Sequence, residues 1–267
     1  MIKIGLIAGS GRFPILFARQ AKKEGVEVIA IAVKGDTSYQ LGRMVRKITW
    51  LNISEFDRIF AVFKDEKIDK AVMAGQINPR RLFNKNNEFG PALEELLGKI
   101  RDKKADTIFS AIAEKLKERG IELISSLTFL SEYLPQKSVL TRRAPSEQEW
   151  QDVYFGLDMA KKIAGLDIGQ TVVIKQKAVL AVEALEGTDV TLLRGGLIGK
   201  GGACAVKVSK PQQDMRFDVP VVGLKTIRSL IKAGISCLAI EAGKTVFLDK
   251  EESVRIADKK GIAIAAV

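Results

Sequence analysis

The sequence predicts an α/β protein built of two domains. Over the first 130 or so residues, short β-branched runs alternate with amphipathic helical stretches, a pattern typical of a parallel sheet covered by helices. Residues 133–147 (YLPQKSVLTRRAPSE) contain two prolines and show no periodicity, which favours a connection there. With 267 residues, 46% of them hydrophobic, the chain can bury a core in each half. We predict domains at 1–133 and 147–267, joined by a linker at 134–146.

The first domain is expected to open with a buried strand at 2–8 and a helix at 13–23. Gly25 stands where a helix stop is expected, ahead of a second strand. The remaining predicted elements are strands at 26–33, 47–51, 70–74 and 122–125, and helices at 55–65, 91–103 and 107–119.

The second domain is expected to begin with a long helix at 147–164. Its predicted strands are 171–175, 179–185, 203–208, 237–241, 245–248 and 262–266. Its other predicted helices open near Asp189 and cover 225–233 and 251–259.

Histidine is absent from the sequence, and only Cys204 and Cys237 are present. This excludes Ser-His and Cys-His nucleophile pairs, histidine bases, most zinc sites and a disulfide framework. We interpret both cysteines as small core residues. Catalysis by Asp and Glu without histidine favours an oxygen-ligated ion, and Mg²⁺ is the predicted cofactor.

A formal net charge of +11 indicates affinity for anions, whether phosphates of a small molecule, an acidic membrane or nucleic acid. Lysine and arginine are spread along the chain in short pairs, so we predict no dedicated nucleic-acid arm. The start of the chain lacks the apolar core of a signal peptide, and no window approaches the roughly 18 apolar residues of a spanning helix. We therefore expect a cytoplasmic protein.

A glycine-rich turn, residues 9–14 (GSGRFP), joins the first strand to the first helix. Backbone N–H groups and the helix dipole make such a turn a seat for phosphate or nucleotide. Pro14 stands where a dinucleotide fingerprint has its third glycine, so a tight turn without a ligand is the alternative. The predicted substrate contacts here are Gly9, Ser10, Gly11, Arg12 and Phe13.

A second loop, residues 75–81 (GQINPRR), follows the strand that ends at Ala74. Arginine can hold a phosphate with its forked donors, and we predict Gln76 and Arg80 as substrate contacts. The alternative is a solvated helix start.

Glu183 lies in a run that is apolar on both faces, residues 179–185 (VLAVEAL). A carboxylate buried there must find a cation, a metal ion or hydrogen-bond donors. Asp189, a few residues later, has the simpler interpretation of a helix N-cap.

The strongest local pattern is residues 207–220 (KVSKPQQDMRFDVP). If the part after residue 213 is extended, Asp214, Arg216 and Asp218 share one face. Two carboxylates beside a guanidinium could hold Mg²⁺, position a water and stabilise charge on a diphosphate. The alternative is an edge strand with a surface ion pair.

With these patterns the chain resembles the LpxI-type UDP-2,3-diacylglucosamine pyrophosphatases of lipid A biosynthesis, over essentially its whole length. The N-terminal half departs from the family at 103–106 (KKAD), which lacks an expected doubled acidic pattern. The matching stretches are 9–14, 167–170 (DIGQ), 183–189 (EALEGTD), 210–220 (KPQQDMRFDVP) and 242–243 (AG).

The resemblance implies a Rossmann-like nucleotide-binding domain, a C-terminal α/β catalytic domain and a lipid substrate in the cleft between them. The implied reaction is hydrolysis of the substrate diphosphate with Mg²⁺ and water, giving UMP and 2,3-diacylglucosamine 1-phosphate. Asp218 is the foremost catalytic residue, with Asp214 and Arg216 beside it. The predicted metal ligands are Asp218, Asp214, Glu183 and Glu186, and the further substrate contacts are Gln170, Thr188 and Lys210.

The expected partners are a UDP-linked diacylated sugar lipid, the surface of the inner membrane in peripheral contact, and a second copy of the chain in a homodimer. Nucleic acid is not expected. Two other functions compete with this prediction: a nicotinamide oxidoreductase, suggested by the glycine turn but lacking an acidic residue after Val33, and a nucleic-acid binder, suggested by charge alone.

Overall fold

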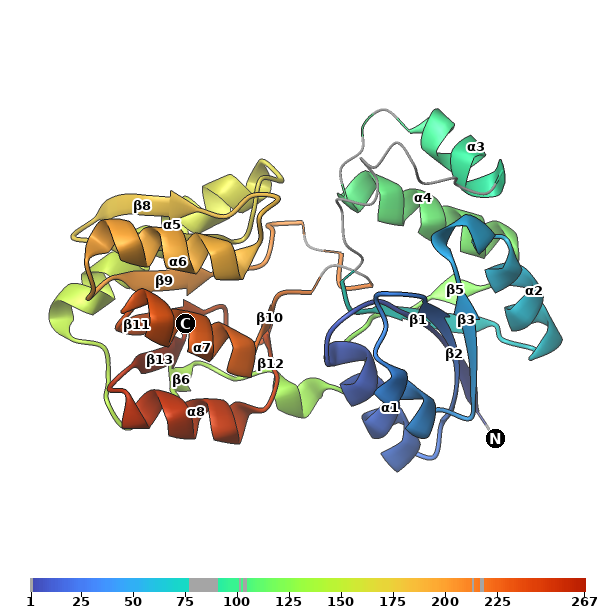
Figure 1. The fold of residues 1–267 in the computed structure, drawn as a ribbon, viewed down its shortest axis with the longest axis horizontal. Helices are drawn as coiled ribbons and strands as arrows, with labels where there is room; N and C mark the ends of the chain where they lie inside the picture. The colour runs from blue at the N-terminus through green and yellow to red at the C-terminus, as the bar shows by residue number, and fades with distance from the viewer. Residues whose placement is uncertain (1, 77–90, 101, 103–104, 213, 217–218) are drawn as a thin grey trace. The chain divides into compact units, whose positions relative to one another are not determined.

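The computed structural model describes residues 2–76, 91–100, 102, 105–212, 214–216 and 219–267 (Figure 1). The chain forms two compact units. The N-terminal unit comprises Met1–Ser131 and Asp214–Asp218, and the C-terminal unit comprises Glu132–Gln213 and Val219–Val267. Both are α/β, which confirms the predicted fold class.

The N-terminal unit contains a five-stranded sheet of order β3-β2-β1-β4-β5, and every neighbouring pair is parallel. This is the strand order of a Rossmann-like sheet, with its reversal point between β1 and β4. Its strands are β1 (Lys3–Ala8), β2 (Glu27–Val33), β3 (Lys47–Leu51), β4 (Lys70–Ala74) and β5 (Glu122–Leu123). Its helices are α1 (Phe13–Lys23), α2 (Arg58–Asp65), α3 (Pro91–Lys99) and α4 (Ala105–Glu118), with 3-10 turns at Tyr39–Arg43 and Ile53–Glu55.

Helices cover both faces of this sheet. Alternate strand residues such as Ile7, Ile29 and Ile31 pack in one cluster with α2, α3 and α4. Helix α1 buries Phe17 and Ala18. Two buried faces explain why β1 and β2 are continuous apolar runs.

The C-terminal unit contains a six-stranded mixed sheet of order β6-β13-β11-β9-β7-β8. Strands β13, β11 and β9 are parallel to one another. Strand β6 pairs antiparallel with β13, and β7 pairs antiparallel with both β8 and β9. The strands are β6 (Ser138–Val139), β7 (Thr171–Lys175), β8 (Ala178–Val182), β9 (Cys204–Lys207), β11 (Cys237–Ile240) and β13 (Ala263–Ala266), and β10 (Val221–Val222) pairs with β12 (Val246–Phe247) separately. The helices are α5 (Glu147–Gly165), α6 (Thr188–Gly199), α7 (Leu224–Ala233) and α8 (Lys250–Lys259).

One face of this sheet packs on α5, and the other packs on α6, α7 and α8 (Figure 1). Cys204 and Cys237 are register partners on β9 and β11 and are fully buried, as predicted for core residues. The hydrogen bond with Cys237, together with burial, raises the pKa of the Cys204 thiol, so the thiol stays protonated.

Several predicted boundaries were wrong. Strand β8 ends at Val182 and not at 185, and β5 covers only two of the four residues predicted for it. Helix α2 begins at Arg58 because Asn52 and Glu55 form a capping box that starts a 3-10 turn ahead of it. Strands β6 and β10 were missed, since two residues are too few to show a period.

In the part of the chain that the structure describes, no helix combines the length and apolar character needed to cross a bilayer.

Candidate functional site

In the N-terminal unit, the structure joins the two loops that the sequence singled out separately. Strands β1 and β4 are neighbours, so the turn after β1 meets the turn after β4 at the reversal point of the sheet. The Gly9 amide donates to the Ala74 carbonyl at 2.8 Å, and the amide and hydroxyl of Ser10 donate to the Gln76 carbonyl at 2.8 and 2.7 Å. Ligands bind at this position in open α/β sheets.

Two glycines make this close approach possible. A Cβ on Gly75, where φ is +88°, would lie 2.5 Å from the Ser10 carbonyl oxygen, and a Cβ on Gly9 would lie 2.8 Å from the Gln76 carbonyl oxygen. Gly11 also has φ +88°, but no atom of the described residues is found within 4 Å of a Cβ placed there. Gly9 and Gly75 therefore serve packing, whereas Gly11 borders open space beside the helix.

Helix α1 begins directly after this turn. Pro14 lies in its first turn, and no side chain of a described residue forms a capping hydrogen bond at its N-terminus. The positive end of the helix dipole and its first amides thus suit an anion. Phe13 is buried, so only its backbone can contribute to binding. Arg80 lies outside the described residues.

In the C-terminal unit, four neighbouring strands bring polar residues to one edge of the sheet. Strands β8, β9 and β11 end there and β7 begins there. The residues delivered in this row are Glu183, Thr171, Lys207 and Glu241. We call Thr171, Glu183, Thr188 and Lys207 the carboxyl-end cluster.

Lys207 is the centre of this cluster. Its side chain is 8% exposed, and its Nζ donates to Thr188 Oγ1 at 2.8 Å and Thr171 Oγ1 at 3.2 Å. Thr188 in turn donates to Glu183 Oε1 at 2.7 Å. The ammonium group lies 3.6 Å from Glu183 Oε2 and forms an ion pair with it.

Glu183 follows β8 directly and its side chain is 12% exposed. Burial tends to raise the pKa of Glu183, but the charge of Lys207 and the surrounding hydrogen bonds outweigh it and lower that pKa. Its Oε2 is buried and makes no hydrogen bond with any residue that the structure describes. The predicted need of this carboxylate for a cation is met by a lysine that the sequence analysis had not assigned.

The stretch 167–170 packs against this cluster. A Cβ on Gly169 would lie 2.0 Å from the Glu183 carbonyl oxygen, so only glycine fits. The Gln170 carbonyl accepts a hydrogen bond from the Val208 amide at 2.9 Å, and Asp167 forms a 2.6 Å ion pair with Lys210. The predicted stretches 167–170 and 183–189 and the first four residues of the predicted stretch 207–220 therefore converge at one edge of the sheet.

Glu241 also belongs to this edge and was missed. Its Oε2 accepts from Lys161 Nζ at 2.6 Å and from the amide and hydroxyl of Ser209 at 2.8 and 2.7 Å, and Lys244 pairs with its Oε1 at 2.9 Å. Burial would raise the pKa of Glu241, but these donors outweigh it and lower the pKa to about 2. A carboxylate closing a predicted apolar strand was the available signal, since it follows the logic already applied to Glu183.

The segment that begins at Asp214 differs from its predicted extended form. Asp214 Oδ1 accepts from the Arg216 amide at 3.0 Å, which closes a turn two residues long, and both carboxylate oxygens bind the Arg216 guanidinium. The hydrogen bonds from Arg216 lower the pKa of Asp214. An aspartate that bonds the backbone two residues ahead favours a turn over a strand, so the predicted extended form is wrong for residues 214–216.

This turn packs within the N-terminal unit. The Met215 carbonyl accepts from the amide and hydroxyl of Ser126 at 2.9 and 3.0 Å. Asp218, the foremost catalytic residue of the prediction, lies outside the described residues.

Comparisons with known proteins agree with this organisation. The LpxI N-terminal domain model matches residues 3–133, and the LpxI C-terminal domain model matches residues 136–265. The chain belongs to the LpxI family. A relative from Caulobacter vibrioides, named UDP-2,3-diacylglucosamine pyrophosphatase LpxI, is 29% identical over 278 residues, which cover 100% of this chain and 98% of that protein.

Solved structures show more distant likeness to this LpxI-family chain. The biotin carboxylase subunit of pyruvate carboxylase has a TM-score of 0.29 at 14% identity, covering 68% of this chain and 36% of that one. N5-carboxyaminoimidazole ribonucleotide synthetase from Thermotoga maritima has a TM-score of 0.24 at 18% identity, covering 65% of this chain and 38% of that one. This chain thus spans little more than a third of the length of either structure.

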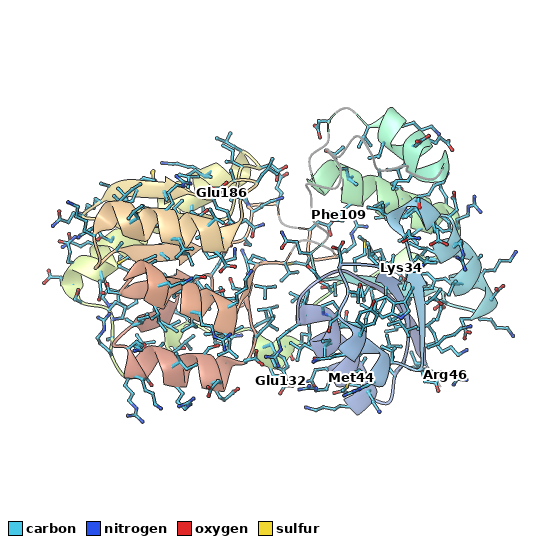
Figure 2. The ribbon with its side chains drawn as sticks, in the orientation of Figure 1. Lys34, Met44, Arg46, Phe109, Glu132 and Glu186 are labelled. Atoms are coloured by element: carbon cyan, nitrogen blue, oxygen red, sulfur yellow. The ribbon has the colours of Figure 1, made fainter. Side chains whose placement is uncertain are left out.

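The described residues among the predicted Mg²⁺ ligands of this LpxI-family chain are divided between the two units. Asp214 belongs to the N-terminal unit, whereas Glu183 and Glu186 belong to the C-terminal unit. Each has a cationic partner, which for Glu186 is Arg194 at 2.9 Å. The side chain of Glu186 is labelled in Figure 2. Within the described ranges, no group of three or more Asp, Glu or Cys side chains is placed to hold a metal ion. The Mg²⁺ requirement stays a prediction.

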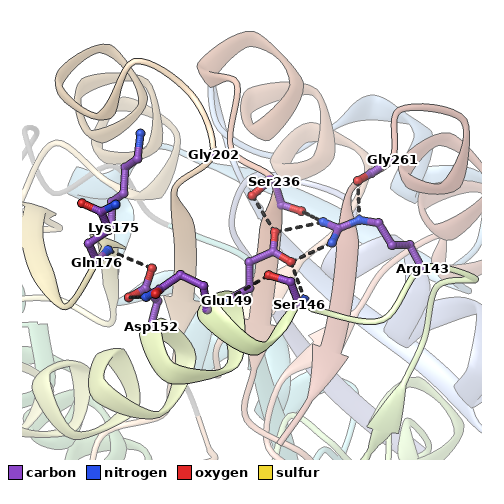
Figure 3. Close-up of a pocket in the computed structure, with 10 residues that line it drawn as sticks. Arg143, Ser146, Glu149, Asp152, Lys175, Gln176, Gly202, Ser236 and Gly261 are labelled. Carbon is purple, nitrogen blue, oxygen red and sulfur yellow. Dashed lines mark hydrogen bonds and ion pairs between the residues drawn. The ribbon is translucent and has the colours of Figure 1, made fainter.

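A cavity of about 400 Å³ lies at the opposite edge of the C-terminal sheet (Figure 3). It is lined by residues that precede β9, β11 and β13, among them Gly202, Ser236 and Gly261. Five of its polar and charged residues form what we call the amino-end network: Arg143, Ser146, Glu149, Asp152 and Ser236.

The amino-end network is saturated with hydrogen bonds. Arg143 donates to both oxygens of Glu149 at 2.7 and 3.0 Å and to the carbonyls of Ser236 and Gly261 at 2.5 and 2.7 Å. Asp152 accepts from two backbone amides of the turn after β7 at 2.9 and 2.7 Å. These groups hold the start of α5 and the strand ends together, which is a structural role.

Proposed function

We propose that this LpxI-family protein hydrolyses the diphosphate of UDP-2,3-diacylglucosamine to UMP and 2,3-diacylglucosamine 1-phosphate, in lipid A biosynthesis. In this reaction, the oxygen of a water molecule bonds to one phosphorus while the bond from that phosphorus to the bridging oxygen breaks. The water gives up its protons, and the bridging oxygen leaves as part of the second phosphate. No redox step is involved.

The observation that carries the proposal is the match to the named Caulobacter relative through both domains. It covers the whole chain and is supported by family models in each half. If the activity resided in one domain only, the other domain would not need to resemble that of the relative.

The first part of the proposed mechanism is binding of the phosphates. The open turn at Gly11 and the uncapped start of α1 suit a phosphate group, which would accept hydrogen bonds from backbone amides. In the C-terminal unit, Lys210 would neutralise phosphate charge while Asp167 holds its ammonium group in place.

The carboxyl-end cluster would act through its neighbours. Glu183 Oε2 is buried and thus out of reach of a ligand, so we propose Glu183 as a positioning residue. Its carboxylate fixes the Thr188 hydroxyl, and with Lys207 it holds the stretches 167–170 and 207–210 in register. Gln170 and Thr188 would then contact the substrate.

Asp218 is proposed, from the family resemblance, as the group that accepts a proton from the attacking water, with Arg216 stabilising phosphate charge. Asp218→Ala should lower the single-turnover rate by about 10²–10⁴-fold, the range for loss of a general base. Asp158→Ala is the matched control, because Asp158 is an exposed aspartate on α5 that pairs with Lys162 one helical turn away. An unchanged rate in Asp218→Ala would remove Asp218 from the chemistry.

The reaction itself is tested by incubating the full chain with UDP-2,3-diacylglucosamine and identifying the products by mass. We expect UMP and the acylated sugar phosphate in equal amounts, with turnover that stops when EDTA removes divalent ions and returns with Mg²⁺. UDP in place of UMP would place the cleaved bond elsewhere and contradict the proposal. Turnover that persists in EDTA would contradict the predicted Mg²⁺ requirement alone.

A further inference from the structure

Helix α6 packs very closely against its own unit. A Cβ on Gly195 would lie 2.6 Å from Val173 Cβ of β7, and a Cβ on Gly196 would lie 2.1 Å from the Ala233 carbonyl oxygen of α7. Leu192, on the same side, is fully buried. The side of α6 that faces the sheet and α7 is therefore closely packed.

The outer face of α6 is also apolar. Val190, Leu193 and Leu197 follow one another at helical spacing and are 49%, 38% and 81% exposed. We call these three residues the α6 stripe. Leu185 and Ile198, near the two ends of the helix, are 70% and 54% exposed. A surface helix normally places polar residues on this side, so the stripe indicates a contact surface.

Helix α7 lies beside α6 and presents positive charge. Besides the contact at Gly196, Ser229 donates to Asp189 at 2.8 Å and Lys225 pairs with Asp189 at 2.6 Å. The exposed residues of α7 at helical spacing are Lys225, Arg228 and Lys232, and its sequence LKTIRSLIKA contains no acidic residue. We call these three residues the α7 basic stripe. Both helices lie on the same side of the sheet in Figure 1.

We propose that the α6 stripe and the α7 basic stripe together form a docking face for an anionic lipid bilayer. Exposed Leu and Val side chains can enter the boundary between headgroups and acyl chains, while lysine and arginine beside them attract acidic headgroups. A 12-residue helix is about 18 Å long, so α6 would lie in the membrane plane.

Charge decides between a bilayer and a second copy of this chain. In a symmetric dimer through this face, two copies of the α7 basic stripe would be brought to one interface, where Asp189 already pairs with Lys225 of its own chain. An acidic membrane surface is complementary to both stripes at once. A bilayer therefore fits the face better than a partner subunit.

The docking face begins where the carboxyl-end cluster ends. Thr188, a member of that cluster, is the first residue of α6, and the stripe starts two residues later. Docking would thus place this edge of the C-terminal sheet close to the lipid headgroups. The use of the face in delivering a diacylated substrate rests on the proposed function, but the binding of the bilayer does not.

The test is flotation of the full chain with phosphatidylcholine vesicles that contain or lack phosphatidylglycerol. We expect binding to the anionic vesicles that falls at least about tenfold on neutral vesicles. Leu193→Ser/Leu197→Ser should weaken binding about tenfold or more through lost apolar contact. Lys225→Gln/Arg228→Gln/Lys232→Gln should also weaken it at least about tenfold.

The matched control is Arg19→Gln/Lys22→Gln/Lys23→Gln, which removes three exposed charges from α1 instead. We expect it to bind within about twofold of wild type. Equal losses in the α1 and α7 variants would show that net charge alone drives binding and would overturn the docking face. So would unchanged binding in the α6 variant.

Two further readouts separate the remaining outcomes. Light scattering gives the oligomeric state, and loss of a dimer in the α6 variant with unchanged vesicle binding would assign the face to a second copy. Hydrolysis of a detergent-dispersed substrate should be the same in wild type and in the folded α6 and α7 variants. Its absence in wild type would contradict the proposed function while leaving the vesicle result intact.

Discussion

The two ends of the C-terminal sheet both hold buried charged side chains, but they differ in how completely those charges are satisfied. At the amino end, Arg143 and Glu149 use their polar atoms on one another, on a serine and on backbone carbonyls. At the carboxyl end, Lys207 and Glu183 are 3.6 Å apart and one oxygen of Glu183 accepts no hydrogen bond among the described residues.

This difference in hydrogen bonding suggests a structural role for the amino end and a functional role for the carboxyl end. A saturated network costs little to bury and fixes the start of α5, as its capping box at Ser146 also does. An incompletely satisfied pair is expensive to bury, and such groups gather where a protein binds or transforms a ligand. The cavity at the amino end is therefore the weaker candidate for chemistry, despite its volume.

The largest effect on stability is expected at the carboxyl end. Lys207→Met should lower the free energy of unfolding by about 3–5 kcal/mol, because Glu183 would stay buried without its cation. Lys207→Met/Glu183→Leu should recover most of that loss in urea unfolding but should not recover hydrolysis. A single variant that costs less than about 1 kcal/mol would show that the pair is not buried as a charged pair.

At the amino end, a substitution should lower stability but leave the rate of hydrolysis nearly unchanged. Arg143→Met should cost about 2–4 kcal/mol, since Glu149 would lose its cation in a partly exposed setting. The kcat of the folded variant should stay within about threefold of wild type. A tenfold lower kcat at full folding would move the candidate site to the amino end.

Acid should weaken both ends to a similar degree. Burial would raise the pKa of Glu149 and of Glu241, but their cationic and hydroxyl donors lower each to about 2 from 4.5. The stability from each carboxylate is therefore complete above about pH 4.5 and is lost as the pH falls toward 2. Urea unfolding of Glu149→Gln and Glu241→Gln across this range should each lack about 2 kcal/mol of the wild-type decline, after allowance for solvent screening. An unchanged decline would contradict these pairings.

The smallest effect on stability is expected for an exposed ion pair, which serves as a reference for the buried pairs. Arg255 and Glu252 pair on the exposed face of α8, with side chains 53% and 45% exposed. Arg255→Gln should leave the midpoint of unfolding unchanged within the error of the same assay, because water screens an exposed ion pair. A loss as large as that of Arg143→Met would mean that burial does not explain the difference between the networks.

Sequence patterns predicted the elements well where a period extended over enough residues. Strands β1, β3, β4 and β7 and helix α1 lie within a residue of their predicted bounds, because apolar runs and helix stops are local features. The turn at Asp214 was predicted wrongly, since alternation over a few residues cannot compete with a side chain that bonds its own backbone.

The candidate site was predictable in part. Glu183 was recognised as a carboxylate in need of a partner, and glycine spacing pointed to the turn at Gly9. The partner, Lys207, stands 24 positions away in the sequence and was not assigned a role, and Glu241 was missed. The pairing of Lys207 with Glu183 leaves no local signal, whereas Glu241 could have been found by the logic applied to Glu183.

The sequence by itself determined the α/β class, the absence of histidine chemistry, the family and the glycines that permit close backbone approach. These depend on residue type and local spacing. Only the tertiary structure decided that the loops after β1 and β4 meet, that Lys207 pairs with Glu183, and that α6 carries its apolar stripe beside the basic stripe of α7. The physical reason is that the order of strands in a sheet and the packing of helices on it depend on the whole chain. Local sequence therefore does not specify which strand ends become neighbours.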